Sequence, residues 1–322
     1  MESRRPRRPV ISIIASTWLA LGALTVEAAA RPSERPALAA SALAVRYRDV
    51  ISPARVRALT VLPGATVEFD VAEPRSGPGY VARPSAGRLD SLGGGRWAWS
   101  APTAPGLYPI HVVAADGRDS VTLQAFVMVP YDSLEGEFLN GYRIGRYLDG
   151  VPRYEPPAGF IEVTRENEDV LVSPHFRLKQ FLCKQPAGAR KYVVLNERLL
   201  LALESVLAEV HAAGYRATTF TVMSGYRTPA YNRSLGNSRF SMHQWGAAAD
   251  IFIDEDGNGV MDDLTGDGRS DARDAERLYR LIDGAAARPE THLWIGGLGK
   301  YAPTANHGPF VHVDVRDRKV RW

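Results

Sequence analysis

Two histidines and one aspartate place the strongest constraint on the fold of this chain. His243 and Asp250 stand seven residues apart in the segment SMHQWGAAADIFID, and His312 follows much later, in PFVHVDV. Zinc takes imidazole nitrogen and carboxylate oxygen as ligands, and a catalytic site uses three protein ligands and leaves a fourth position open. The small residues at 246–249 let the backbone pass close to a metal before Asp250 opens an apolar strand at residues 251–253. We therefore expect a fold that brings these three side chains to one zinc ion.

The residues around these ligands resemble a known family. The pattern Ser241, His243, Gly246, Ala248 and Asp250, followed by a distal His312, resembles the zinc D-alanyl-D-alanine carboxypeptidases of peptidase family M15, whose relatives include peptidoglycan endopeptidases. SGYRTPAYN, GGLGKY and FVHVDV resemble it too, and the likeness runs from SPHFRLKQFLCKQ onward, closest to the subgroup called the M15A C-terminal domain. The resemblance implies that His243, Asp250 and His312 bind zinc. It also implies that Arg227 faces a charged or developing negative oxygen of the substrate.

One position departs from the pattern of that family. Many members carry an acidic general base three residues before the second histidine, where this chain has Pro309. Asp314 lies two residues beyond His312 on a predicted strand, so its side chain would share a face with His312 and serve as the base or as a partner of that ligand. His307, five residues before His312, offers an acid or an oxyanion donor; the alternative is a solvated loop residue.

The chemistry of Arg227 supports a functional role independently of the resemblance. A guanidinium recognises a carboxylate through two hydrogen bonds or stabilises an oxyanion. Arg227 follows a predicted strand at residues 219–223 and precedes Thr228-Pro229, which is an N-cap followed by proline in the first turn of a helix. Residues at such junctions often point into clefts, whereas we expect the neighbouring Tyr226 to pack in the core.

An acidic insertion at residues 254–274 has the spacing of calcium-binding loops. Counted from Asp263, loop positions 1, 3, 5, 7, 9 and 12 fall on Asp263, Thr265, Asp267, Arg269, Asp271 and Asp274, with Gly268 at the sharp turn. An overlapping set contains Asp254, Asp256, Asn258 and Asp262, but has Thr265 at position 12. Clustered carboxylates repel one another unless a cation neutralises them, so we expect calcium here, with an exposed acidic loop as the alternative.

The first 30 residues have the pattern of a secretory signal peptide. A basic start, MESRRPRRP, precedes an apolar run at residues 10–26 and three alanines at residues 28–30. A retained membrane anchor is the alternative, although the run is at the lower length limit for a spanning helix and contains Ser12, Ser16 and Thr17. We expect cleavage after Ala30 and a periplasmic or extracellular protein that is not inserted in a membrane after cleavage.

Signal cleavage would remove most of the positive charge. The first 30 residues carry four Arg and two Glu, so they supply +2 of the formal net charge of +3 and leave +1 for the rest. No stripe of basic and aromatic residues follows, and we therefore expect no nucleic-acid partner. The single cysteine, Cys183, cannot form an internal disulfide, and its apolar neighbours favour a buried thiol. The oligomeric state is not specified.

We predict an α+β chain with five segments. These are a signal peptide at residues 1–30, a flexible lead at 31–41, an all-β immunoglobulin-like sandwich at 42–130, a connector at 131–169, and an M15-like zinc peptidase domain with an antiparallel sheet at 170–322. Alternation at Val67, Phe69 and Val71 indicates a strand, and the Asp116-Gly117 turn indicates a hairpin.

Two further signals locate core elements in these segments. Trp97 and Trp99 share one face of a predicted strand, so we expect them in the core of the sandwich. Asn196 can cap a helix whose apolar positions recur at helical spacing up to Gly214.

These features predict an exported zinc metallopeptidase that hydrolyses D-amino-acid-containing peptide bonds of peptidoglycan, with wall peptides as its partners. Whether it acts as a carboxypeptidase or an endopeptidase stays open, because that depends on whether the cleft is closed beyond the scissile bond. Pro309 keeps a non-catalytic, zinc-containing cell-wall-binding module as the alternative. A hydrolase of other small peptides is a third option.

Overall fold

Strands dominate the first third of the described structure. The computed structural model describes residues 40–72, 79–186, 188, 190–288 and 295–322. The predicted signal peptide lies outside these residues, as does the predicted lead except for its last two residues, which begin the first strand. In the described part of the chain, no helix combines the length and apolarity needed to cross a bilayer.

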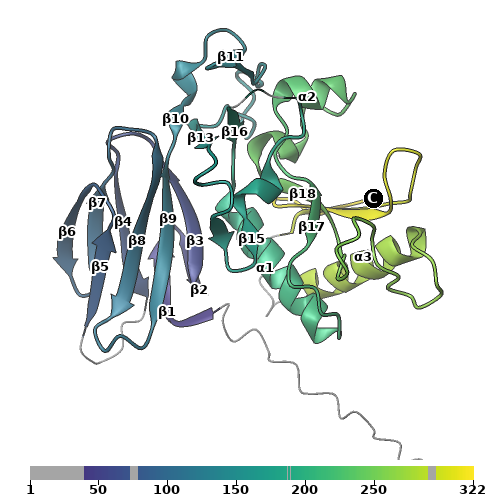
Figure 1. Cartoon of the computed structure of the whole chain (residues 1–322), viewed down its shortest axis with the longest axis horizontal. Helices are drawn as coiled ribbons and strands as arrows, with labels where there is room; N and C mark the ends of the chain where they lie inside the picture. The colour runs from purple at the N-terminus through teal and green to yellow at the C-terminus, as the bar shows by residue number, and fades with distance from the viewer. Residues whose placement is uncertain (1–39, 73–78, 187, 189, 289–294) are drawn as a thin grey trace, which may run out of the picture. The chain divides into compact units, whose positions relative to one another are not determined.

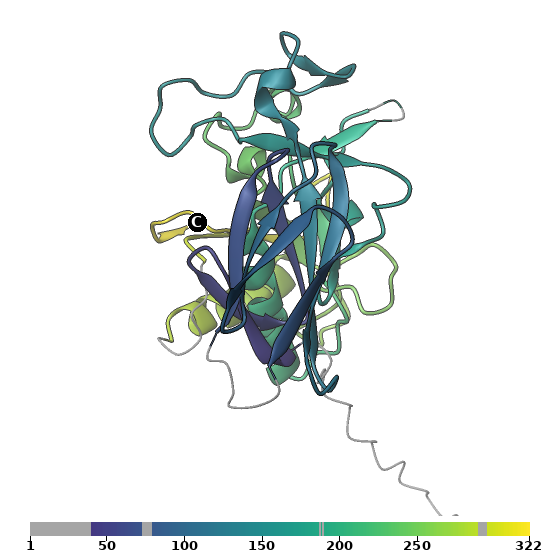
Figure 2. The ribbon, with the colours of Figure 1, turned by 90° about the vertical axis from the view of Figure 1, so that its left-hand side faces the viewer.

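The N-terminal region consists of two β-sheets (Figures 1 and 2). One has the strand order β2-β1-β4-β7-β6 and the other β3-β9-β8-β5. Neighbouring strands are antiparallel, apart from β3 and β9, which run parallel. The strands are β1 (Ala40–Tyr47), β2 (Val50–Ala54), β3 (Val56–Val61), β4 (Thr66–Ala72), β5 (Tyr80–Pro84), β6 (Arg88–Gly93), β7 (Arg96–Ser100), β8 (Gly106–Ala114) and β9 (Ser120–Val127).

Inward-facing apolar residues of both sheets form one hydrophobic core. Trp97 and Trp99 are buried in it, as predicted, and the Trp97 ring stacks on Phe69 with 5.5 Å between centroids. The predicted hairpin is confirmed, because β8 pairs with β9 and Gly117 in the turn has φ +69°. A positive φ is a conformation that glycine adopts without steric cost.

Short elements follow these two sheets. They are β10 (Val129–Pro130), η1 (Tyr131–Ser133), β11 (Phe138–Leu139), β12 (Tyr142–Arg143), β13 (Gly159–Val163), β14 (Leu171–Ser173), β15 (Phe176–Arg177), η2 (Leu178–Phe181) and β16 (Lys191–Val193). Cys183 is buried here, as its apolar neighbours indicated.

The C-terminal part is a mixed α+β arrangement around a five-stranded sheet of order β17-β18-β20-β19-β21. Its elements are α1 (Glu197–Ala212), β17 (Thr221–Ser224), α2 (Pro229–Ser234), η3 (Met242–Trp245), β18 (Ala248–Phe252), α3 (Ala272–Ala286), β19 (Gly297–Tyr301), β20 (Phe310–Asp314) and β21 (Val320–Arg321). An antiparallel sheet was expected, but β21 pairs parallel to β19. The chain reverses direction after β19 and again after β20, so β21 runs in the direction of β19, and it pairs with β19 rather than with β20.

Local capping signals set the starts of two helices, as predicted. The Asn196 side chain accepts a hydrogen bond from the backbone N–H of Arg198 at the start of α1, and the apolar face of α1 is buried. The Thr228 side chain accepts from Tyr231 at the start of α2, where Pro229 occupies the first turn. These caps satisfy N–H groups that have no partner within the helix.

A buried ion pair joins the first sheets to α1. Arg57 on β3 is 1% exposed, and its Nη2 lies 2.5 Å from Oε1 of Glu197. The same guanidinium donates to the backbone carbonyl of Val45. All described residues belong to one compact unit, Ala37–Trp322. A buried guanidinium that loses its carboxylate partner keeps the cost of desolvation without the compensating attraction.

We therefore expect Glu197→Ala to lower the free energy of unfolding by about 3 kcal/mol. Urea denaturation followed by circular dichroism measures this. The matched control is Arg198→Ala, the next residue, whose exposed side chain pairs with Asp49 across 2.5 Å. An exposed pair contributes little, so the control should unfold like the wild type. Equal losses in the two variants would contradict the importance of the buried pair.

Candidate metal centre

The pairing of β18 with β20 brings two of the predicted ligands together. Asp250 on β18 is directly opposite His312 on β20 in the antiparallel register. Ser224 of β17 continues this row on one side and Gly299 of β19 on the other. Side chains directly opposite one another in a sheet project to the same face, so the register alone places the carboxylate beside the imidazole. Asp250 lies in the middle of its strand, rather than at its start as expected from the sequence.

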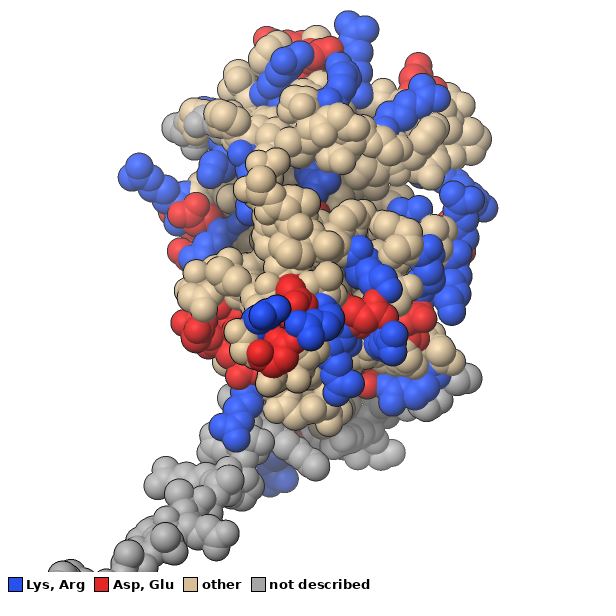
Figure 3. Space-filling view, turned by 90° about the vertical axis from the view of Figure 1, so that its right-hand side faces the viewer, with Lys and Arg blue, Asp and Glu red and all other residues tan. Residues whose placement is uncertain are grey.

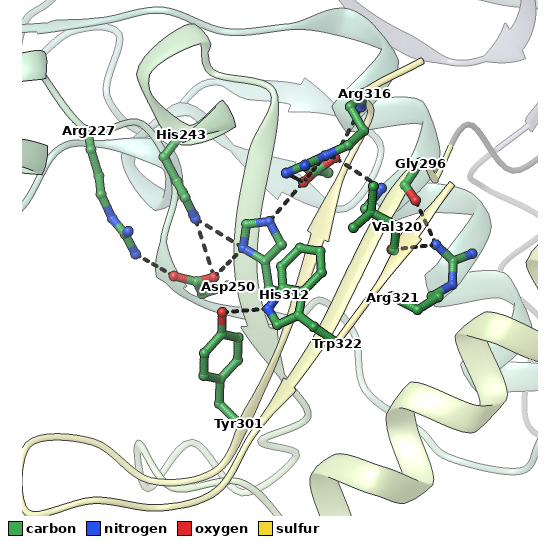
Figure 4. A network of polar contacts seen from close by, with 12 residues as sticks. Arg227, His243, Asp250, Gly296, Tyr301, His312, Arg316, Val320, Arg321 and Trp322 are labelled. Carbon is green, nitrogen blue, oxygen red and sulfur yellow. Dashed lines mark hydrogen bonds and ion pairs between the residues drawn. The ribbon is translucent and has the colours of Figure 1, made fainter. Parts of the chain in front are cut away.

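Three ligand atoms converge at this point (Figure 4). His312 Nδ1 lies 2.8 Å from Asp250 Oδ1, and His243 Nε2 lies 3.2 Å from His312 Nδ1 and 3.3 Å from Asp250 Oδ1. All three residues are buried. Ligand atoms on a tetrahedral zinc ion, each about 2.0–2.2 Å from the metal, lie about 3.3 Å from one another. The spacing of the three atoms therefore fits zinc.

The outer contacts of the two histidines fix which nitrogen faces the centre. His243 Nδ1 lies 2.6 Å from the carbonyl oxygen of Gly225, and His312 Nε2 lies 3.1 Å from Oδ2 of Asp314. A carbonyl and an ionised carboxylate only accept, so these nitrogens are the N–H donors. The opposite nitrogens, His243 Nε2 and His312 Nδ1, both face Asp250 Oδ1, and in the neutral rings they carry the lone pairs that can bind a metal.

In the trio of His243, Asp250 and His312, electrostatics favour the protonation state that a metal requires at His243 and Asp250, but not at His312. Burial lowers the pKa of His243 and outweighs the opposing effect of Asp250, which favours the neutral ring. Burial raises the pKa of the Asp250 carboxyl, but the contacts with His243 and His312 outweigh it and hold that pKa well below its ordinary value. Burial lowers the pKa of His312, but Asp250 and Asp314 outweigh it and raise that pKa, so metal binding would displace a proton from this ring. With that proton released, the trio supplies the neutral imidazoles and the ionised carboxylate that metals bind.

Arg227 lies next to the trio, at the junction between β17 and α2. Its Nη2 donates to Oδ2 of Asp250 across 2.5 Å, and its Nε donates to the Ser224 hydroxyl across 2.7 Å. The guanidinium thus holds the second oxygen of Asp250 and leaves Oδ1 facing the histidines. The contact with Ser224 was missed by sequence reasoning, although Ser224 ends the strand that leads to Arg227.

Asp314 shares a face with His312, as strand alternation predicted. It is fully buried, and its carboxylate also binds the Arg316 guanidinium, with Nε 2.8 Å from Oδ1 and Nη2 2.5 Å from Oδ2. The backbone N–H of Gly297 donates to Oδ1 across 3.0 Å. Burial raises the pKa of Asp314, but His312 and Arg316 outweigh it and hold the pKa well below its ordinary value. Its oxygens therefore already have protein donors.

The trio opens into a cleft of about 920 Å³. His307 lines this cleft, half-buried, with its ring packed edge-on against Phe310 at 5.0 Å between centroids. Its Nδ1 lies 2.8 Å from the carbonyl of Gly308, so Nδ1 carries the proton in the neutral ring and Nε2 is the basic nitrogen.

Two aromatic residues of the cleft were not singled out from the sequence as site residues. The Trp322 ring lies 5.2 Å from the His312 ring, and its Nε1 donates to the Tyr301 hydroxyl across 2.7 Å. A Cβ atom at Gly299 would lie 2.4 Å from the indole, so glycine is needed there. Tyr154 comes from the segment before β13 and also lines the cleft. Gly299, in the segment GGLGKY, is the sequence feature that leaves room for the Trp322 ring.

The family model described as Peptidase M15 matches residues 174–264. Residues 174–264 are a peptidase M15 domain. No curated protein is similar enough to the chain to count as a match. His243 and Asp250 lie inside the matched range and His312 lies beyond it, so β20 completes the centre of the M15 domain.

The acidic insertion follows β18 of the M15 domain. Ligand oxygens of Asp254, Asp256 and Asp262 lie within 4.8 Å of one another, and the Asn258 backbone N–H donates to Asp254 and Asp256. The acids of the set counted from Asp263 are paired with donors of the protein. Asp263 accepts hydrogen bonds from the backbone N–H groups of Thr265, Gly266 and Gly268. Asp267 and Asp271 form ion pairs with Arg273, and Asp274 completes a capping box at the start of α3. Calcium binding by this segment stays a prediction.

Removing one ligand of the M15 centre should abolish metal binding. We expect wild-type protein to retain one zinc per chain after gel filtration and His312→Ala to retain none, because two ligands do not complete the site. Zinc is counted by mass spectrometry of the eluted protein. His307→Ala is the matched control, since it lies in the same cleft outside the trio. One zinc per chain in His312→Ala would exclude the proposed ligand set.

Proposed function

We propose that this protein is an exported zinc metallopeptidase that hydrolyses D-amino-acid-containing peptide bonds of peptidoglycan. The observation that carries the proposal is the convergence of His243, Asp250 and His312 at a cleft, with two of the three residues inside the matched M15 range. Peptidases of this family act on peptides, which supports peptide hydrolysis as the reaction class. The wall substrate rests on the sequence resemblance, and export rests on the pattern of the first 30 residues.

Zinc bound by the trio supplies Lewis-acid chemistry, which polarises the peptide carbonyl and activates water for attack. The chain must then position the substrate and move protons. Arg227 is placed to stabilise negative charge beside the centre, since one edge of its guanidinium holds Asp250 and the side chain lines the cleft.

Of the two roles open for Asp314, the contacts favour positioning. Its carboxylate receives His312 Nε2–H, a bidentate guanidinium and a backbone N–H, and it is fully buried. A carboxylate held in this way orients the ligand ring and raises its basicity, and is a poor acceptor for a further proton. We assign Asp314 as the residue that orients His312.

His307 is then our candidate for proton transfer. An imidazole accepts and donates a proton near neutral pH, and the basic Nε2 of His307 belongs to a ring that lines the same cleft as the trio. Pro309, which occupies the position of the acidic base in many relatives, leaves this task to another residue.

We also infer that the N-terminal sheets form an immunoglobulin-like sandwich. The order β1-β4-β7-β6 corresponds to strands A, B, E and D of that fold, and β9-β8-β5 corresponds to G, F and C. The shared core between the sheets supports the assignment.

Digestion of purified muropeptides tests the function. Zinc-loaded wild type should release fragments whose masses identify the bond cut, and His312→Ala should release none. Loss of a terminal residue would indicate a carboxypeptidase, whereas an internal cut would indicate an endopeptidase. Binding of the fragments without hydrolysis would reject the peptidase and favour the wall-binding module.

Two substitutions should separate the roles of His307 and Asp314. His307→Gln should keep zinc affinity and lower kcat by about a hundredfold or more, because it removes a proton-transfer group. Asp314→Asn should weaken zinc binding by roughly tenfold or more, because it removes the acceptor that orients His312. Zinc competition titrations and steady-state kinetics measure both effects. Unchanged zinc affinity together with collapsed turnover in Asp314→Asn would reassign it as the base.

A further inference from the structure

One wall of the cleft is built by two segments that lie outside the matched M15 range. Arg153 and Tyr154 come from the stretch before β13, and Asp317 and Arg318 come from the turn between β20 and β21. An ion pair joins the two segments, with 3.4 Å between Arg153 Nη1 and Asp317 Oδ2. Both Tyr154 and Arg318 line the cleft that holds the metal centre.

Tyr154 is anchored against the loop that carries His243. Its ring lies 4.9 Å from the ring of Phe240 and 5.3 Å from that of Trp245. The indole Nε1 of Trp245 donates to the carbonyl of Glu155 across 2.8 Å. Contacts of the Tyr154 ring and the hydrogen bond to the carbonyl of the next residue, Glu155, therefore both hold Tyr154 in place at the cleft.

Three arginines line the cleft, and two of them already have carboxylate partners. Arg227 binds Asp250, and Arg316 binds Asp314 through two nitrogens. Asp250 is the one acidic residue among the described residues that line the cleft.

Arg318 is the third arginine, and it is exposed. Its neighbour in the chain, Asp317, forms an ion pair with Arg153. Among the described residues, Arg318 has no carboxylate within ion-pair distance. Its positive charge is therefore available to a ligand in the cleft.

The charge of the wider surface does not by itself select an anionic ligand. Lys and Arg side chains are interspersed with Asp and Glu side chains over the face shown in Figure 3. A mixed surface exerts little long-range attraction on an anion, so a preference for negative charge would come from individual residues at the cleft.

We propose that Arg318 and Tyr154 form an outer subsite that binds a free carboxylate of the peptide substrate. The guanidinium of Arg318 pairs with the carboxylate, and the Tyr154 ring packs against the adjoining part of the peptide. The substrate class is thus an acidic peptide with a carboxylate outside the bond that is cut. This inference rests on the proposed peptidase function, and Arg318 acts in substrate recognition rather than in the chemical step.

A cycle of two enzymes and two substrates tests the subsite. Zinc-loaded wild type and Arg318→Gln are each assayed on a muropeptide with a free side-chain or α-carboxylate and on the same peptide with that carboxylate amidated. A charge-assisted hydrogen bond accounts for roughly a tenfold effect. We expect Arg318→Gln to lose roughly tenfold in kcat/KM on the free carboxylate, mainly through KM, and to change less than about twofold on the amide.

Lys319→Gln is the matched control. It removes a neighbouring positive charge whose Nζ lies 3.9 Å from Asp283 and which does not line the cleft. Lys319→Gln should keep the wild-type preference for the free carboxylate. Equal losses by Arg318→Gln on both peptides, or no loss on either, would overturn the subsite.

Failure of the peptidase function can be told apart from failure of the subsite. If wild type cuts neither peptide, the proposed function fails. The affinities of wild type and Arg318→Gln for the two peptides are then measured by calorimetry. A binding preference for the free carboxylate that disappears in Arg318→Gln would still support the subsite. Equal binding of both peptides by wild type would reject it.

Discussion

The register between β18 and β20 is the constraint on which the metal centre depends. Antiparallel pairing sets Asp250 opposite His312, and Ala248 opposite Asp314. A slip of one residue would turn either ligand to the opposite face of the sheet, because side chains alternate along a strand. Apolar residues on the other face, such as Ile251 and Val311, are fully buried, so a slipped register would also place charged groups in the core. Packing of the core thus protects the geometry of the site.

Local and periodic features of the sequence predicted much of this arrangement. Asn196 and Thr228 marked helix starts because capping depends on residues only a few positions apart. Strand alternation correctly put Asp314 on the face of His312. The residue types of the trio indicated a metal, since imidazole and carboxylate at such spacing are what zinc binds. Each of these inferences used a period or a short spacing that the sequence displays directly.

Contacts between distant segments were beyond such reasoning. Tyr154 reaches the cleft from a part of the chain far from the ligands, and Trp322 reaches His312 through a parallel strand where an antiparallel sheet was expected. Arg316 was not singled out from the sequence, although its guanidinium forms an ion pair with Asp314. The buried pair of Arg57 and Glu197 joins residues that no local pattern connects. Such contacts depend on how whole sheets pack, and a single sequence carries little information on that packing.

The distribution of the three ligands gives a bound metal a mechanical role. His243 lies in a short 3-10 turn, and Asp250 and His312 lie on separate strands with the acidic insertion and α3 between them. An ion held by all three would cross-link these elements, and a cross-link that closes a long stretch of chain restricts the unfolded ensemble. Because binding to the folded state alone shifts the folding equilibrium, the metal-free chain would open more often between β18 and β20. Its resistance to proteases in the surroundings would then depend on the supply of zinc.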